Sequence, residues 1–225
     1  MNKIFNVKSK LLSKVKITDK TYEFIYEAPS NFIFTPGQFV GLRVLPHPMK
    51  AYSIISVNNN KVTLLIDINT KSRYFEQTII GDELNLMGPY GIYKVKETLL
   101  DKVFIATGSG VAPFISMLDK LKETSNHFKD IKVTLFFGCR YIKDDLAWHY
   151  LSDFKYDNFK YIRCVTMPES QIQDEQGRVT SIVPKHNIYW ENTEFYICGS
   201  SNMVTEMNEI LKNLGANKIY VEKFD

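Results

Sequence analysis

Short stretches of alternating hydrophobic and polar residues occupy about the first 97 positions of the chain. β-branched and aromatic residues are concentrated in these stretches, and Gly, Pro, Asn and Asp separate them. The pattern predicts strands at 14–17, 22–27, 38–45, 52–56, 62–67 and 83–86, with one short helix near 73–79. Many short strands with tight turns are typical of an antiparallel barrel or sandwich.

From about residue 101 the period of the pattern changes, and apolar strands alternate with helical segments. Strands are predicted at 103–107, 132–138, 161–166, 194–198 and 219–222, and helices at 112–122, 144–151 and 203–214. Such alternation predicts a parallel, doubly wound sheet. We therefore predict two domains, 1–98 and 99–225. In the second domain, ligands are expected beyond the carboxyl ends of the strands.

Composition narrows the class of protein. The 225 residues are 44% hydrophobic and 24% charged, with a net charge of +3, which is too mild to indicate nucleic-acid binding. No apolar run approaches the ~20 residues of a membrane helix, and the N-terminus lacks the apolar segment of a signal peptide, so we expect a cytoplasmic protein. Three dispersed cysteines without a CxxC pair argue against an iron–sulfur cluster or a metal site.

Residues 107–113 (Thr-Gly-Ser-Gly-Val-Ala-Pro) join a predicted strand to a predicted helix. Glycines allow the backbone to turn tightly and to approach a pyrophosphate, toward which the free N–H groups of the helix would point. Pro113 suits an early helical position, where no N–H is needed. A Gly-rich turn without a ligand is the alternative, but the strand–helix context favours a dinucleotide-binding loop.

Three further segments carry candidate chemistry, and each has a plain structural alternative. Residues 50–56 (Lys-Ala-Tyr-Ser-Ile-Ile-Ser) could hold a phosphate and a ring, or form an ordinary alternating strand. Cys198, at the end of a strand, could be a functional thiol or a core thiol. Residues 220–225 (Tyr-Val-Glu-Lys-Phe-Asp) could be a site or only a last edge strand with a frayed end.

Taken together and in order, these segments resemble the ferredoxin–NADP reductase family over nearly the whole chain. The motifs that carry the resemblance are residues 50–56, Gly-Pro-Tyr-Gly at 88–91, residues 107–113, Phe-Gly-Cys-Arg at 137–140, Gly-Arg-Val-Thr at 177–180, Cys-Gly-Ser-Ser-Asn-Met at 198–203 and Glu-Lys-Phe at 222–224.

The resemblance implies an antiparallel Greek-key β-barrel that binds FAD, followed by a doubly wound parallel-sheet domain that binds NADPH or NADH. It implies an FAD-dependent enzyme, expected to be a monomer, that moves electrons between NAD(P)H and a one-electron carrier such as ferredoxin or flavodoxin, with hydride transfer at flavin N5. The alternatives are the reductase component of a multi-component oxygenase or another electron-transfer subunit, and a non-catalytic FAD- or nucleotide-binding module.

The resemblance also implies the site residues. Ser53, Cys198 and Glu222 would surround the reacting rings, and Tyr52 and Phe224 would pack on the flavin. The cofactor-binding residues would be Lys50, Ala51, Tyr52, Ser53, Ser56, Asp67, Lys71, Ser72, Arg73, Thr107, Gly108, Ser109, Gly110, Val111, Pro113, Arg140, Thr166, Arg178, Cys198, Gly199, Met203 and Phe224.

Three positions depart from the family pattern. Lys50 replaces an arginine on the FAD pyrophosphate, which keeps the charge but loses the bidentate fork. Ser72 and Arg73 lie in a turn without the usual glycine, so they could bind phosphate or merely cap a helix. Thr166-Met167 replaces a Ser-Arg pair, which weakens the case for NADPH. Arg140 could bind a 2′-phosphate or pair with Asp144 or Asp145, and the dinucleotide preference stays open.

Overall fold

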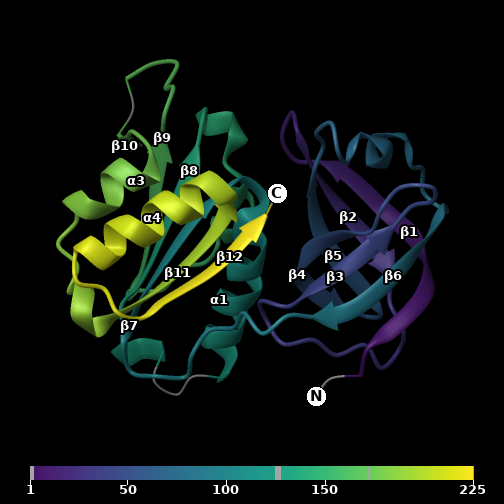
Figure 1. Ribbon diagram of the computed structural model, residues 1–225, viewed down its shortest axis with the longest axis horizontal. Helices are drawn as coiled ribbons and strands as arrows, with labels where there is room; N and C mark the ends of the chain where they lie inside the picture. Colours follow the sequence, from purple (N-terminus) through teal and green to yellow (C-terminus); the bar gives the residue numbers. More distant parts are fainter. Residues whose placement is uncertain (1–2, 125–127, 172, 225) are drawn as a thin grey trace. The chain divides into compact units, whose positions relative to one another are not determined.

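The computed structural model describes residues 3–124, 128–171 and 173–224. They form two compact units: one comprises the described residues up to Lys94 with Ala112–Leu118, and the other comprises Val95–Val111 and the described residues from Asp119 onward. Figure 1 follows the chain through both units. Within these described ranges, no helix is long and apolar enough to cross a membrane.

The first unit contains a closed barrel of six antiparallel strands in the order β1-β2-β5-β4-β3-β6, which confirms the predicted barrel (Figure 1). Its elements are β1 (Phe5–Lys16), β2 (Thr21–Glu27), β3 (Phe39–Arg43), β4 (Lys50–Asn58), β5 (Lys61–Asp67), a 3₁₀ helix η1 (Arg73–Gln77) and β6 (Glu83–Tyr90).

Strand β1 is much longer than the predicted segment 14–17. Its first half pairs with β6 and its second half with β2, so one strand closes the barrel on both sides. The first half was missed because Ser9, which is 2% exposed, occupies an inward position where a hydrophobic residue was expected. The Ser9 hydroxyl donates a hydrogen bond to the carbonyl of Glu27 at 2.6 Å, which makes its burial acceptable.

Large apolar and aromatic side chains fill the barrel. Phe24, Leu42 and Phe75 are among the fully buried residues. Phe75 comes from η1, and its ring makes an edge contact with Phe24 at a centroid distance of 5.8 Å. Because burying a phenylalanine contributes roughly 1.5–3 kcal/mol, this side chain fastens the short helix to the barrel.

The second unit contains a six-stranded sheet in the order β10-β9-β8-β7-β11-β12, with every neighbouring pair parallel. This confirms the predicted doubly wound domain. The strands are β7 (Asp101–Thr107), β8 (Val133–Cys139), β9 (Phe159–Val165), β10 (Glu175–Gln176), β11 (Thr193–Ser200) and β12 (Ile219–Phe224). The helices that follow β7 in the chain are η2 (Gly108–Val111), α1 (Ala112–Thr124), of which Ala112–Leu118 belongs to the first unit, η3 (Phe128–Asp130), η4 (Ile142–Asp144), α2 (Leu146–Leu151), α3 (Val179–Ile182), η5 (Val183–Lys185), η6 (Trp190–Asn192) and α4 (Ser201–Asn213).

Helices α3 and α4 cover the same face of this sheet, as Figure 1 shows. Val179 and Ile182 of α3 and Met207 and Leu211 of α4 belong to one buried cluster with the sheet residues beneath them. The sequence did not predict α3, because it has only four residues and Val and Thr at its start favour strands. Packing on the sheet, rather than local propensity, therefore holds this helix.

Candidate active site

The carboxyl ends of β7 and β11 pack against each other with no room for side chains at two positions. A Cβ on Gly110 would lie 2.5 Å from the carbonyl oxygen of Cys198, and one on Gly199 would lie 2.4 Å from Oγ1 of Thr107. Gly108 has φ of 55°, in the left-handed region where glycine is favoured. Gly108 therefore makes the turn after β7, whereas Gly110 and Gly199 allow the end of β7 and the loop after it to pack directly against the end of β11.

Two predicted residues, Cys198 and Glu222, lie side by side at the carboxyl ends of their strands. Cys198 of β11 pairs in register with Ala106 of β7 and with Glu222 of β12. The thiol is fully buried, and burial followed by the nearby carboxylate of Glu222 raises its pKa well above the usual value. Cys198 is therefore an uncharged thiol at neutral pH, suited to packing and not to nucleophilic attack.

A pocket of about 260 Å³ crosses the carboxyl ends of β11, β7, β8 and β9. It is lined by Thr107, Gly138, Cys139, Arg140, Thr166, Arg178, Val179, Thr180, Ser200, Asn202, Met203 and Glu206. Eight of these twelve residues carry hydroxyl, amide or charged groups, as expected for a ligand with phosphate and ribose groups, while the larger part of the exposed lining is apolar. Its place beyond the strand ends is where open α/β sheets bind their ligands.

The arginines near this pocket differ in their partners. Arg163 pairs with Asp145 and, at 3.0 Å, with Asp174. The Asp145 carboxylate also accepts the Tyr161 hydroxyl at 2.8 Å. Arg140 has no ion pair or side-chain hydrogen bond within the described residues, so the alternative in which it pairs with Asp144 or Asp145 is not what this structure shows.

On the barrel, two predicted segments are brought together by ring contacts. Tyr52 of β4 makes an edge contact with Phe75 of η1 at 5.5 Å. In the loop before β4, His47 stacks on Tyr74 of η1, with centroids 4.0 Å apart and planes 5° apart. The strand that begins at Lys50 therefore lies beside η1.

The polar groups of this region fit a ligand with phosphates and a planar ring. Lys50, Lys71 and Arg73 have no ion pair or side-chain hydrogen bond in the portion of the chain that the structure describes. The buried Tyr74 hydroxyl also lacks a partner there. Cations and aromatic rings with unused polar groups are what FAD would engage.

Other predicted flavin-site residues already have internal contacts. The Ser72 hydroxyl donates to the carbonyl of Asp67 and accepts the N–H of Asn69 at 2.9 Å, so it closes a turn. The carboxylate of Asp67 accepts a hydrogen bond from Thr21. Ser53 is buried, Ser56 is half-buried and Ala51 is exposed. The Ser72 side chain therefore belongs to the turn before η1 and makes no capping hydrogen bond to this helix, and its backbone N–H also donates within the turn, to the carbonyl of Asn69 at 3.1 Å.

Comparison with known proteins agrees with this geometry. The family model described as "Oxidoreductase NAD-binding domain" matches residues 104–209. The toluate 1,2-dioxygenase electron transfer component of Pseudomonas putida is 28% identical over 201 residues, which cover 85% of this chain and 59% of the relative. Residues 104–209 therefore match an oxidoreductase NAD-binding domain, and most of the chain is similar to an electron-transfer component.

Two solved structures have a fold similar to that of this chain. The ferredoxin reductase in carbazole 1,9a-dioxygenase has a TM-score of 0.84 at 23% identity, covering 99% of this chain and 70% of that one. A ferredoxin NADP⁺ reductase from Neisseria gonorrhoeae with bound FAD and NADP has a TM-score of 0.78 at 21% identity, covering 97% and 98%. These likenesses confirm the order of barrel and parallel-sheet domain.

The predicted site residues from Thr107 onward fall into two groups, those that line the pocket and those that lie near it. Thr107, Arg140, Thr166, Arg178 and Met203 line the pocket. The others from residue 108 onward lie at the neighbouring strand ends, in the loop, at the start of α1 and in β12: Gly108, Ser109, Gly110, Val111, Pro113, Cys198, Gly199, Glu222 and Phe224. Pro113 is the second residue of α1, as expected.

The prediction of site residues omitted part of the pocket lining. Ser200 is the last residue of β11, Asn202 and Glu206 lie on α4, and Thr180 lies in α3. The i, i+4 spacing of Asn202 and Glu206 places both on one face of α4, a signal that the sequence contained. Among the described residues, no group of three or more His, Cys, Asp or Glu could hold a metal ion.

Proposed function

We propose that this protein is an FAD-dependent reductase that takes electrons from NAD(P)H and delivers them singly to a protein electron carrier. The observation that carries the proposal is the pocket across the strand ends, which is lined by Thr107, Arg140 and Arg178. Cys198, in register with Glu222, lies two residues before the pocket residue Ser200 on β11. NAD(P)H gives up two electrons as hydride, and two one-electron acceptors are reduced in turn. FAD, when bound, supplies the chemistry that links these two modes.

The barrel residues would bind and orient the flavin. Lys50 would neutralise phosphate charge, and the Tyr52 ring, held by its edge contact with Phe75, would present a flat apolar surface. The raised pKa of Tyr52, caused mainly by burial, keeps its hydroxyl protonated. Ser53, buried on the same strand, is the proposed hydrogen-bonding neighbour of the reacting ring.

The second unit would position the dinucleotide. Thr107 and the loop that follows it would hold the pyrophosphate end, since Gly110 fixes this loop on β11. The uncharged thiol of Cys198 would pack beside the nicotinamide and fix the position of this ring. Such positioning is a large source of rate, because small displacements of reacting atoms can cost about 100-fold.

Charge favours an acidic electron carrier as the partner. Residues 1–94 contain 12 Lys and Arg against 7 Asp and Glu, whereas the whole chain has a net charge of only +3. A basic surface attracts an acidic protein and accelerates its association. Ferredoxins and flavodoxins are the carriers proposed on this basis.

A second candidate is the reductase component of a multi-component oxygenase. The relatives named as an electron transfer component of toluate 1,2-dioxygenase and as a ferredoxin reductase in carbazole 1,9a-dioxygenase favour it. This chain spans 59% of the length of the toluate 1,2-dioxygenase component. The identity of the protein that accepts electrons from this chain is therefore itself a proposal.

The test is a reduction assay with the purified protein loaded with FAD. Ferricyanide or a tetrazolium dye should be reduced with NADH or NADPH, and reduction of cytochrome c should require an added ferredoxin or flavodoxin. Rates with carriers should fall as salt rises, since charge guides the encounter. If the dye is reduced but neither ferredoxin nor flavodoxin supports reduction of cytochrome c, a dedicated oxygenase partner would be favoured. If neither NADH nor NADPH supports reduction of the dye, the proposal would be refuted.

A further inference from the structure

Two buried hydroxyls of the barrel unit, those of Tyr26 on β2 and Tyr74 on η1, have no hydrogen-bond partner among the described residues. Tyr26 is only 1% exposed, so bulk water does not reach its side chain. Burial, followed by the nearby carboxylate of Asp82, raises the pKa of Tyr26 and keeps its hydroxyl protonated. A buried polar group without a partner is rare in folded proteins and needs an explanation.

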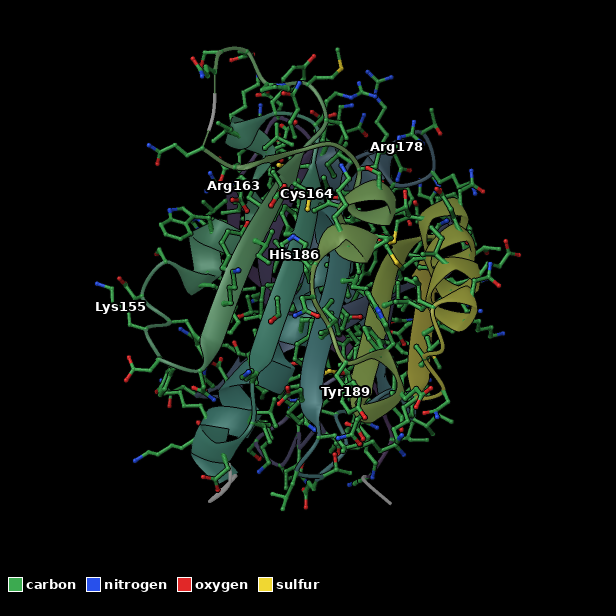
Figure 2. All side chains as sticks on the ribbon, turned by 90° about the vertical axis from the view of Figure 1, so that its left-hand side faces the viewer. Lys155, Arg163, Cys164, Arg178, His186 and Tyr189 are labelled. Carbon is green, nitrogen blue, oxygen red and sulfur yellow. The ribbon has the colours of Figure 1, made fainter. Side chains whose placement is uncertain are left out.

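Largely buried polar side chains of the parallel-sheet unit give a contrast. Figure 2 labels two of them, Arg163 and His186. Arg163 pairs with two aspartates, and Nε2 of His186 lies 3.5 Å from a carboxylate oxygen of Glu175. Their partners belong to the chain itself. The group that would satisfy Tyr26 has to come from solvent or from a ligand.

Tyr26 lines a pocket of about 140 Å³ at the end of the barrel where β2 and β3 finish and β6 begins. The side chains of Leu11, Val44 and Leu84 supply apolar walls, whereas those of Asp82 and Glu83 are acidic. Within the described part of the chain, no Lys, Arg or His lines this pocket. The pocket therefore combines an apolar surface with negative charge.

Both carboxylates have oxygens that remain available to a ligand. Asp82 accepts the N–H of Ile79 at 2.9 Å through Oδ2, and its other oxygen has no partner in the described ranges. Glu83 lies 3.8 Å from the ammonium of Lys8 in an exposed pair, too far for a hydrogen bond. Lys14 does not line the pocket, and its ammonium donates to two backbone carbonyls at the end of η1.

This pocket is separate from the proposed flavin site. The flavin segments adjoin the start of η1 at Arg73, whereas the pocket residue Thr78 is the C-cap at its other end. With a rise of about 2.0 Å per residue in a 3₁₀ helix, η1 separates these two ends by about 10 Å. None of the residues predicted to bind FAD lines the pocket.

We propose that this pocket binds a small primary alkylammonium ion. The ammonium would donate hydrogen bonds to the Tyr26 hydroxyl oxygen and to Asp82, and the alkyl chain would lie on Leu11 and Leu84. A cavity of about 150 Å³ can hold a molecule the size of benzene, so a chain of about six non-hydrogen atoms fits. A bare metal ion fits poorly, because hard cations such as Ca²⁺ take about six to eight oxygen ligands and much of this wall is apolar.

The test is isothermal calorimetry on the purified protein with pentylammonium and with 1-pentanol, which has the same chain and no charge. Pentylammonium should bind at least 10-fold more tightly. Tyr26→Phe should weaken its binding about 10-fold, since a hydrogen bond to a charged group is lost. This variant should fold, because it keeps the ring that stacks on Phe24 at 6.0 Å. Asp82→Asn should weaken binding about 5-fold and can still accept the N–H of Ile79.

Tyr22→Phe is the matched control, because Tyr22 lies on the same strand but does not line the pocket, and it should change affinity less than about 2-fold. Equal binding of pentylammonium and 1-pentanol, or equal losses in the two tyrosine variants, would overturn the proposal. Binding of neither ligand would also overturn it and would leave an ordered water as the partner of Tyr26. Tighter binding of Nα-acetyl-lysine methylamide than of pentylammonium would replace the free ion by a lysine of a partner protein.

Discussion

Lys102 and Glu194 form an ion pair at 3.0 Å in which the two side chains are only 0% and 2% exposed. The pair lies near the amino ends of β7 and β11. Lys102 also donates to the carbonyl of Leu100, and Glu194 accepts the hydroxyl of Tyr196 at 2.8 Å. Full pairing of both charges makes their burial tolerable.

Removing one partner should therefore be costly. Lys102→Met should lower the free energy of unfolding by about 3–5 kcal/mol, because Glu194 would be left as an uncompensated buried charge. Urea denaturation measures the change. Lys8→Met, in the exposed pair with Glu83 at 3.8 Å, is the control and should cost less than about 1 kcal/mol. Equal small losses in the two variants would show that the buried pair is not important to stability.

Lys50 should contribute to flavin retention. The purified protein should be yellow and release FAD, not FMN, on denaturation. Lys50→Ala should weaken FAD binding by roughly 1–3 kcal/mol, the scale of a hydrogen bond to a charged group, as measured by fluorescence titration of the apoprotein. Lys61→Ala, an exposed lysine at the start of β5, should leave affinity unchanged. A colourless protein that takes up no added FAD would exclude the flavin assignment.

Cys198→Ser should slow hydride transfer while changing FAD content little. The hydroxyl nearly preserves the volume but alters the packing where the nicotinamide is proposed to lie. Stopped-flow flavin reduction in a single turnover measures the effect. Cys164→Ser is the matched control, because Cys164 is equally buried in the same unit. If both variants lose stability and neither slows reduction, Cys198 has only a core role.

Buried thiols should make the protein less stable at alkaline pH. Burial, followed by the nearby Glu175, raises the pKa of Cys164 from 9.0 to about 12. Above pH 9 the unfolded thiol loses its proton while the native thiol keeps it. Stability therefore falls with rising pH, by about 1.4 kcal/mol per pH unit for this group.

The check is the slope of unfolding free energy against pH from 8 to 10. Cys164→Ala should flatten the slope relative to the native protein. Val165→Ala creates a cavity at a buried neighbour without removing a thiol, so it should lower stability and keep the native slope. Parallel slopes for the native protein and Cys164→Ala would contradict the pKa assignment.

Residues whose structural position depends only on their neighbours in the sequence could be assigned from the sequence. Gly108 and Pro113 occupy a strand–turn–helix segment, and short-range patterns identify such segments well. Interactions between distant segments were not predictable. Arg163, rather than Arg140, pairs with Asp145, because neighbouring strands β8 and β9 bring residue 163 beside the segment after β8.

Two further features were not predicted because they also depend on contacts between segments that are distant in the sequence. The partners Lys102 and Glu194 are 92 positions apart, and each sits in a strand where a hydrophobic residue would be expected. Gly110 was predicted to allow a pyrophosphate to approach, whereas in the structure its missing side chain makes space for the backbone of Cys198. Only tertiary packing distinguishes these two uses of a glycine.

The contact between Gly110 and Cys198 also restricts how the protein can be altered. Any larger residue at Gly110 or Gly199 must push apart the turn after β7 and the end of β11. Arg140 and Arg178 carry no such constraint, because both side chains are exposed and line the pocket. A library that reshapes this pocket can therefore vary the two arginines freely but must keep both glycines.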